Sequence, residues 1–138
     1  MTNRANRDAA EAVYARFVDP EGGRAGVYEV LHDEVSFECP FYDDFVPRTG
    51  RAEVEAMMRR MDEGADAFFA AQRFPFHALH ATDDPDRFII EVHGDHQIRH
   101  TGKPYRNHYF HCLTIEDGKV RRWVEYSNPE EFERATTA

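Results

Sequence analysis

The chain has 138 residues, of which 41% are hydrophobic and 31% charged, and its formal net charge is −9. This length and composition are typical of one folded domain over residues 1–138 and exclude a disordered chain. The acidic surface disfavours nucleic acid and anionic membranes as partners, because both are negatively charged. No stretch reaches the ~18 apolar residues of a membrane helix and residues 1–16 contain no apolar signal segment, so we expect a cytoplasmic protein.

The first half of the chain reads as helices around one strand. Apolar residues at helical spacing predict a helix over 9–18, and a second short helix is predicted over 24–31. Alternating apolar and polar residues predict a strand over 35–39. The proline- and aspartate-rich segment 41–49 is expected to be a loop, followed by a third helix over 50–64.

The second half reads as consecutive strands, predicted over 73–82, 87–99, 105–115 and 119–128. The segments between them are rich in Asp, Gly and Pro, and the Asp-Gly pair at 117–118 is a strong hairpin signal. Three N-terminal helices and a curved mixed or antiparallel sheet indicate an α+β fold. A sheet wrapped over helices leaves a conical cavity, which is a natural site for a small molecule.

Glu125 is the strongest candidate for acid–base chemistry. A two-residue turn at 117–118 predicts that Glu125 lies opposite Phe110, so that Trp123, Phe110 and His108 share its face. Burial among aromatic rings would raise the pKa of the carboxyl group towards the range useful to a general acid or base. The alternative is a salt bridge to a nearby arginine on a solvated face.

His93 is predicted to pair with Phe110 from the other side, which would place it on the face of Glu125. The two groups could then act on opposite ends of one ligand, with His108 orienting the substrate or relaying a proton. The alternative for His93 is an ordinary histidine bonded to the backbone. Histidines three apart on a strand lie on opposite faces, so we expect no metal site.

Other side chains are candidates for binding the substrate, together with Phe110 and Trp123. Tyr42 lies in the predicted loop and could donate its phenol to a ligand, while Tyr14 faces either the core or the cavity. Met57 and Met61 belong to the apolar stripe of the third helix, which forms core packing or an adaptable cavity wall. The sequence has no Gly-rich phosphate loop, Cys-x-x-Cys or Gly-x-Ser-x-Gly motif, so nucleotide, zinc and serine-hydrolase mechanisms lack support.

The C-terminal half resembles a known family. Segments 83–88, 107–111 and 116–119, and above all the Glu-Tyr-Ser-Asn-Pro run at 125–129, resemble the SnoaL-like branch of the NTF2-like superfamily, in particular the PhzA/PhzB phenazine-biosynthesis proteins. This resemblance implies a cone-shaped α+β fold, a homodimer formed through the sheet and no cofactor. It also implies that Glu125 serves in proton transfer or in binding a cationic intermediate.

The chain departs from those relatives at positions that grip their substrate. Met57 and Met61 stand where they carry a His and a Ser, and Val124 stands where an Arg precedes their acidic residue. A more apolar substrate is therefore expected. The leading hypothesis is a cofactor-independent enzyme of secondary metabolism that cyclises, isomerises, dehydrates or condenses an apolar cyclic molecule, with Glu125 as general acid or base.

Two rival functions use the same fold. One is a non-catalytic protein that binds a hydrophobic small molecule, for which changing Glu125 to Gln would alter affinity and abolish no reaction. The other is epoxide opening by two aspartates bridged by an arginine, as in limonene-epoxide-hydrolase-like relatives. That mechanism requires an inward-facing Asp, Arg and Asp, and the predicted strands show no such trio.

Overall fold

The computed structural model describes residues 2–138, and side chains from residue 4 onward. The helices are α1 (Thr2–Val18), α2 (Ala25–Glu29), α3 (Arg51–Phe68) and α4 (Pro129–Thr136). The strands are β1 (Leu31–Glu38), β2 (Arg48–Thr49), β3 (Phe69–Ala81), β4 (Arg87–Ile98), β5 (Pro104–Glu116) and β6 (Lys119–Tyr126). This order confirms the α+β prediction.

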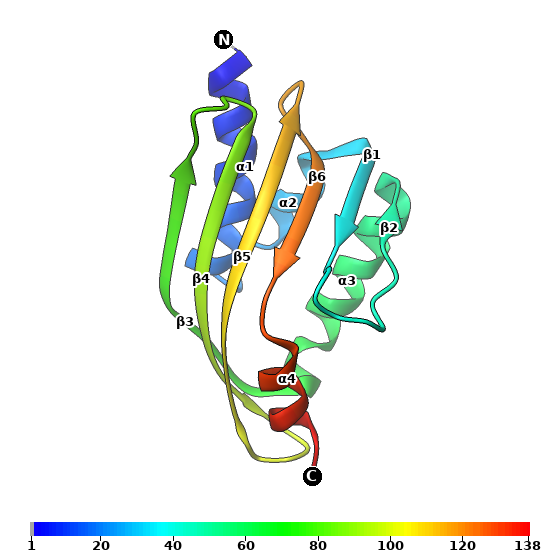
Figure 1. Cartoon of the computed structure of the whole chain (residues 1–138), viewed down its shortest axis with the longest axis vertical. Helices are drawn as coiled ribbons and strands as arrows, with labels where there is room; N and C mark the ends of the chain where they lie inside the picture. Colours follow the sequence, from blue (N-terminus) through cyan, green and yellow to red (C-terminus); the bar gives the residue numbers. More distant parts are fainter. Residues whose placement is uncertain (1) are drawn as a thin grey trace.

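The strands form one curved six-stranded sheet in the order β2-β1-β6-β5-β4-β3 (Figure 1). Neighbouring strands from β3 to β6 are antiparallel, whereas β1 runs parallel to β6, so the sheet is mixed, which is one of the two arrangements expected from the sequence. Helices α1, α2 and α3 lie on one face of the sheet, and α4 lies at one end of it (Figure 1). We call the face under these helices the inner face and the opposite one the outer face.

The hydrophobic core fills the space between the helices and the inner face. Its buried members include Val13, Val54, Met57, Ile90, Leu113 and Trp123. Because side chains alternate along a strand, each strand residue belongs to either the inner or the outer face, and the register decides which one. None of the described helices is both long and apolar enough to span a bilayer.

Several predicted boundaries differ from the structure. Helix α1 and strands β1 and β3 begin earlier than predicted, at Thr2, Leu31 and Phe69, and β2 lies in the predicted loop. Helix α3 continues through Gly64 to Phe68, because the burial of Ala65 outweighs the roughly 1 kcal/mol cost of a glycine within a helix. Helix α4 was not predicted, although its start is marked in the sequence. The Asn128 side chain accepts a hydrogen bond from the backbone N–H of Glu130 at 3.0 Å, and Pro129 occupies the first helical turn.

The β5–β6 hairpin begins as the sequence predicts. Asp117 and Gly118 both adopt positive φ angles, 53° and 72°, which is the conformation of a tight hairpin turn. Ile115 then pairs with Val120, as expected for a two-residue turn.

Candidate active site

A β-bulge next to this hairpin determines which side chains meet Glu125. The register shifts between Ile115 and Thr114, so that Thr114 pairs with Arg122 and every later pair is displaced by one residue. Glu125 therefore lies opposite His111, and the predicted pairing with Phe110 is wrong. A shift of one residue turns every β5 side chain to the opposite face relative to β6. The β5 residues predicted to lie beside Glu125 are therefore all on the other face of the sheet.

Glu125 is on the inner face, and its side chain is 21% exposed. The thiol of Cys39 donates a hydrogen bond to one carboxylate oxygen at 3.8 Å, and Nδ1 of His111 lies 3.8 Å from the other. Burial raises the pKa of Glu125 to about 7, although the Cys39 hydrogen bond and the charge of Arg16 both lower it. The carboxyl group is therefore close to half protonated near neutral pH, which suits an acid–base role.

His111 is buried beside Glu125 and is held in one tautomer. The indole N–H of Trp123 donates to Nδ1 of His111 at 3.0 Å, which leaves the imidazole proton on Nε2. Burial lowers the pKa of His111 to about 3, and the charge of Arg16 lowers it further, so the ring is neutral and forms no ion pair with Glu125. The Nε2 atom is buried and has no hydrogen-bond partner among the described residues.

Unpartnered buried N–H groups are rare, because each costs about 1–3 kcal/mol. The Nε2–H of His111 is thus a free donor that a ligand oxygen could satisfy. Phe17, at the end of α1, stacks on the imidazole with ring centroids 4.8 Å apart and fixes the ring from the helix side.

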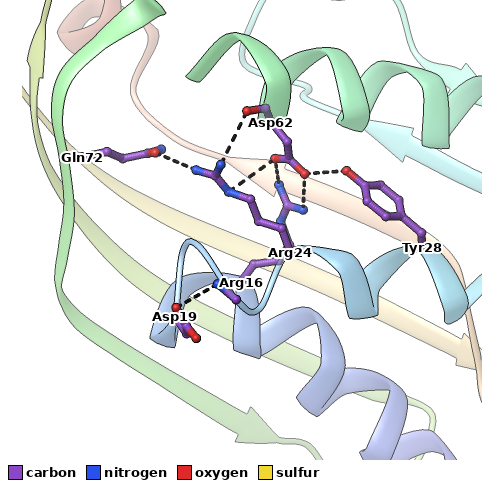
Figure 2. Close-up of polar contacts among 7 residues, drawn as sticks. Arg16, Asp19, Arg24, Tyr28, Asp62 and Gln72 are labelled. Carbon is purple, nitrogen blue, oxygen red and sulfur yellow. Dashed lines mark hydrogen bonds and ion pairs between the residues drawn. The ribbon is translucent and has the colours of Figure 1, made fainter. Parts of the chain in front are cut away.

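An ionic cluster holds the end of α1 against the other helices (Figure 2). Asp62 of α3 accepts two hydrogen bonds from Arg16, at 2.9 and 3.2 Å, and one from the hydroxyl of Tyr28 at 2.5 Å. Arg24 lies 3.8 Å from Asp62 and donates to Gln72 of β3 at 3.1 Å. These bonds position Arg16, which is the cation that influences both Glu125 and His111.

The same cluster bears on the epoxide-opening hypothesis. That chemistry needs an arginine between two aspartates, whereas here one aspartate, Asp62, lies between Arg16 and Arg24. Within residues 4–138, no arginine forms ion pairs with two aspartates.

His93 and His108 lie on the outer face, so their predicted partnership with Glu125 is wrong. They pair across β4 and β5, and their rings stack with centroids 3.8 Å apart. His93 also contacts Glu91 at 3.3 Å. The predicted face depended on the register of the hairpin, which the bulge changes.

Two candidate binding residues are also displaced from the site. Phe110 is on the outer face and 42% exposed, again because of the bulge. Met61 is 55% exposed, whereas Met57 is buried as part of the core. In that turn of α3 the inward position is taken by Asp62, which belongs to the ionic cluster.

The remaining candidates face the interior. Trp123 is buried and shares the inner face with Glu125, as predicted. Tyr42 is half-buried, and its hydroxyl is 2.8 Å from that of Ser127. The hydroxyl of Tyr14 bonds to Nδ1 of His77 at 2.6 Å, and its ring packs against the core.

Sequence reasoning did not identify His111, Cys39 or Arg16 as members of the site. The only sequence signal for His111 was its position next to Phe110. The Asp117-Gly118 turn is compatible with a strand pairing that places Phe110 opposite Glu125 and with one, shifted by one residue, that places His111 there. In the described part of the chain, no three His, Cys, Asp or Glu side chains converge to hold a metal ion.

The outer face carries a hollow of about 740 Å³. Its lining includes His93, Asn107, His108, Phe110, Tyr126 and Ser127. It lies across the sheet from Glu125 and is therefore distinct from the candidate acid–base site.

A family model described as a SnoaL-like domain matches residues 10–123. The phenazine biosynthesis protein PhzB1 of Pseudomonas aeruginosa is 40% identical over 53 residues, which cover 36% of this chain and 33% of that protein. Matches to the curated relatives thus span about a third to a half of their length.

Solved structures show the same fold. The crystal structure of PhzB2 from Pseudomonas aeruginosa superposes with a TM-score of 0.72 at 23% identity, covering 97% of this chain and 82% of that one. A putative polyketide cyclase from Xanthomonas campestris gives a TM-score of 0.71 at 18% identity, with 98% of both chains covered. The cone-shaped fold and the match over most of the chain agree, and the chain belongs to the family of SnoaL-like domains.

Proposed function

We propose that this protein is an acid–base catalyst for a small, largely apolar cyclic metabolite of secondary metabolism, with Glu125 as the proton carrier and no cofactor. The observation that supports it most directly is a carboxyl group on the inner face whose pKa is raised by burial to about 7. A positioned acid or base of this pKa typically contributes about 10²- to 10⁴-fold to a rate.

His111 completes the proposed site as an electrophile. Trp123 fixes the neutral tautomer with its proton on Nε2, and that N–H is unpartnered. A carbonyl oxygen of the substrate would accept this hydrogen bond, and the negative charge that develops there would be stabilised as Glu125 removes a proton from an adjacent carbon. Cyclisations and isomerisations of ketones both begin with this step.

The relatives support this reaction class. They include proteins of phenazine biosynthesis and a putative polyketide cyclase, whose names refer to the assembly of cyclic metabolites. Met57, the one of the two aligned methionines that is buried, supports a largely apolar ring, whereas the exposed Met61 does not contribute to this argument.

The proposal can be tested with 5-nitrobenzisoxazole, a small ring that reports on a base in an apolar pocket. Removal of its C3–H by a carboxylate breaks the N–O bond and gives a coloured nitrophenolate, while the proton remains on the base. We expect the wild-type protein to accelerate this reaction, with a rate that rises with pH around a midpoint near 7. Glu125→Gln should lower the rate about 10²-fold or more.

Glu91→Gln is the matched control, because Glu91 is a carboxylate of the same sheet that contacts His80 and His93 on the outer face. It should leave the rate unchanged. A Glu125→Gln variant that retains the wild-type rate, or a wild-type protein no faster than acetate buffer, would contradict the proposal. A variant that binds the probe differently without any rate to lose would favour the non-catalytic binding protein instead.

We also propose that a second copy of the chain covers the outer face. Phe76 and Phe110 are exposed there beside the stacked pair of His93 and His108, and exposed aromatic patches are typical of protein interfaces. The resemblance to the phenazine proteins implies a homodimer through the same surface.

A further inference from the structure

A second buried histidine of the inner face, His96, has no role in the site described above. It lies on β4 opposite Tyr105 and is 4% exposed. The backbone N–H of Arg73 donates to its Nδ1 at 3.1 Å, which leaves the imidazole proton on Nε2. Burial lowers the pKa of His96 to about 4, although Asp95 raises it and Arg73 lowers it further, so the ring is neutral at pH 7.

The Nε2–H of His96 has no acceptor within residues 4–138. Gln72 is the cross-strand neighbour of His96 on β3, but its side-chain oxygen accepts a hydrogen bond from Arg24 (Figure 2). His96 thus has the same tautomer as His111, whose Nε2–H also lacks a partner. The inner face therefore presents two neutral imidazole donors that a ligand could satisfy.

The ring of His96 leans along β4 towards the acid–base site. A Cβ atom added to Gly94 would be 2.5 Å from Nε2 of His96 and 3.0 Å from Cε2 of Tyr109, so both rings lie against this glycine. Tyr109 in turn lies parallel to His111, with ring centroids 6.2 Å apart. A single aromatic ring thus separates the two histidines on the inner face.

The helices do not completely cover this part of the inner face. Nearer the β5–β6 turn, Leu113 and Trp123 are each 1% exposed. Phe74 and Tyr109 are only partly buried although they pack towards the helices, and the side chain of Glu125 is 21% exposed. Apolar surface therefore remains between Glu125 and His96 for a ring system to cover.

The strand register gives the separation of the two donors. His111 pairs with Ile90, whereas Nε2 of His96 lies against Gly94, four residues further along β4. At about 3.3 Å per residue, this separation is roughly 13 Å along the strand and shorter across the curve of the sheet. A ligand that bonds to both donors must therefore be elongated.

We propose that His96 is a second hydrogen-bond donor for the ligand of the inner face, at the opposite end from Glu125 and His111. The ligand is a flat, fused-ring molecule with a carbonyl oxygen at each end. His111 donates to the oxygen near Glu125, His96 donates to the distant one, and the rings lie against Tyr109 and Phe74. His96 thereby selects and orients the substrate, and this role rests on the proposed function, which makes the inner face the binding site.

Two ligands of nearly identical shape test the distant donor. One is 2,6-diacetylnaphthalene, which has a ketone at each end, and the other is 2-acetyl-6-isopropenylnaphthalene, in which a CH₂ group replaces one ketone oxygen. Equilibrium dialysis should show that the wild type binds the diketone about 10-fold more tightly, which is the effect of one hydrogen bond. His96→Phe keeps an aromatic ring and removes the N–H, so it should bind the two ligands equally.

Two further variants separate donation from packing. His96→Gln supplies another side-chain N–H and should retain a preference for the diketone, which a purely structural role of the ring would not explain. His80→Phe makes the control exchange at an exposed histidine beside Glu91 and should bind as the wild type does. A wild type that does not distinguish the ligands, or a folded His96→Phe that still prefers the diketone, would overturn the role of His96.

The wild type alone also tests the inference, so the test does not depend on whether a variant folds. In protein with ¹⁵N-labelled histidine, His96 should carry its proton on Nε2 at pH 7. The Nε2 resonance should shift when the diketone is added and stay in place with the isopropenyl analogue. A proton on Nδ1, or the same shift with both ligands, would contradict the proposal.

The binding measurement is independent of catalysis. Glu125→Gln should still prefer the diketone, so a refuted catalytic role would leave this preference intact. Conversely, a wild type without the preference would leave the rate difference between the wild type and Glu125→Gln on 5-nitrobenzisoxazole untouched, because that small probe does not span both donors.

Discussion

The two faces of the sheet carry similar residues with different properties. On the inner face, Glu125 and His111 are largely buried, and burial raises the pKa of the acid to about 7 and lowers that of the base to about 3. On the outer face, Nε2 of His93 lies 3.3 Å from the carboxylate of Glu91, and the histidine ring stacks on that of His108 in a half-exposed setting. The shifted pKa values are therefore a property of the inner environment, since the residue types alone do not distinguish the two faces.

The largest expected difference between the faces is in packing. Trp123→Ala should lower the free energy of unfolding by about 3–5 kcal/mol, because the side chain is buried and its N–H bonds to His111. Phe110→Ala should cost under about 1 kcal/mol in the monomer, because the ring is 42% exposed. Urea denaturation of both variants measures this difference, and equal losses would mean that the faces are assigned incorrectly.

The next difference is in the pH dependence of stability. The pKa of Glu125 rises from 4.5 to about 7 on folding, so between these values the native state binds more protons than the unfolded state and stability falls as pH rises. Glu125→Gln lacks this loss. Its free energy of unfolding should exceed that of the wild type by up to about 3 kcal/mol above pH 7, with little difference below pH 4.5.

His111 contributes in the opposite direction. Its pKa is lower in the folded state than in the unfolded state, so the free energy of unfolding decreases as pH falls below the unfolded-state pKa of 6.5. That contribution is common to both proteins, so the difference between them isolates Glu125. Thermal unfolding across this pH range decides the matter, and parallel curves for wild type and Glu125→Gln would contradict the burial of the carboxylate.

Because the proposed dimer forms through the outer face, substitutions on this face should weaken self-association more than substitutions on the inner face. Phe110→Asp places a charge in the centre of the aromatic patch and should weaken dimerisation by about 2 kcal/mol or more. Sedimentation velocity over a concentration series would then shift from dimer towards monomer. A wild-type chain that sediments as a monomer at every concentration would rule out this interface.

The smallest expected effect compares the two cysteines. Cys39 donates to Glu125 from the inner side, whereas Cys112 lies on the outer face, opposite Val124. Cys39→Val removes a hydrogen bond that lowers the pKa of Glu125, so the pH–rate midpoint should rise by a fraction of a unit. Cys112→Val should leave the midpoint in place, and a shift of equal size in both variants would show that the thiol acts only through packing.

Much of the fold could be predicted from the sequence, because helical spacing, strand alternation and turn residues are local signals. The Asp117-Gly118 turn and the α+β order are examples. Identifying Glu125 and Trp123 as inward neighbours required only that residues two apart share a face. His111 could not be identified, because a bulge at one pair of residues is decided by packing across the sheet and leaves no local signal.

The ionic cluster could not be predicted from the sequence either. Arg16 and Asp62 are 46 positions apart and meet only when α1 packs beside α3. Their roles depend on tertiary contacts, and no spacing rule within one helix connects them.

The most direct test of the central claim is a titration of the Glu125 carboxyl carbon by ¹³C NMR, assigned by comparison with Glu125→Gln. A carboxyl group buried on the inner face beside neutral His111 should titrate with a pKa near 7. A pKa near the ordinary value of 4.5 would mean that the side chain is in water, and the catalytic proposal would be wrong.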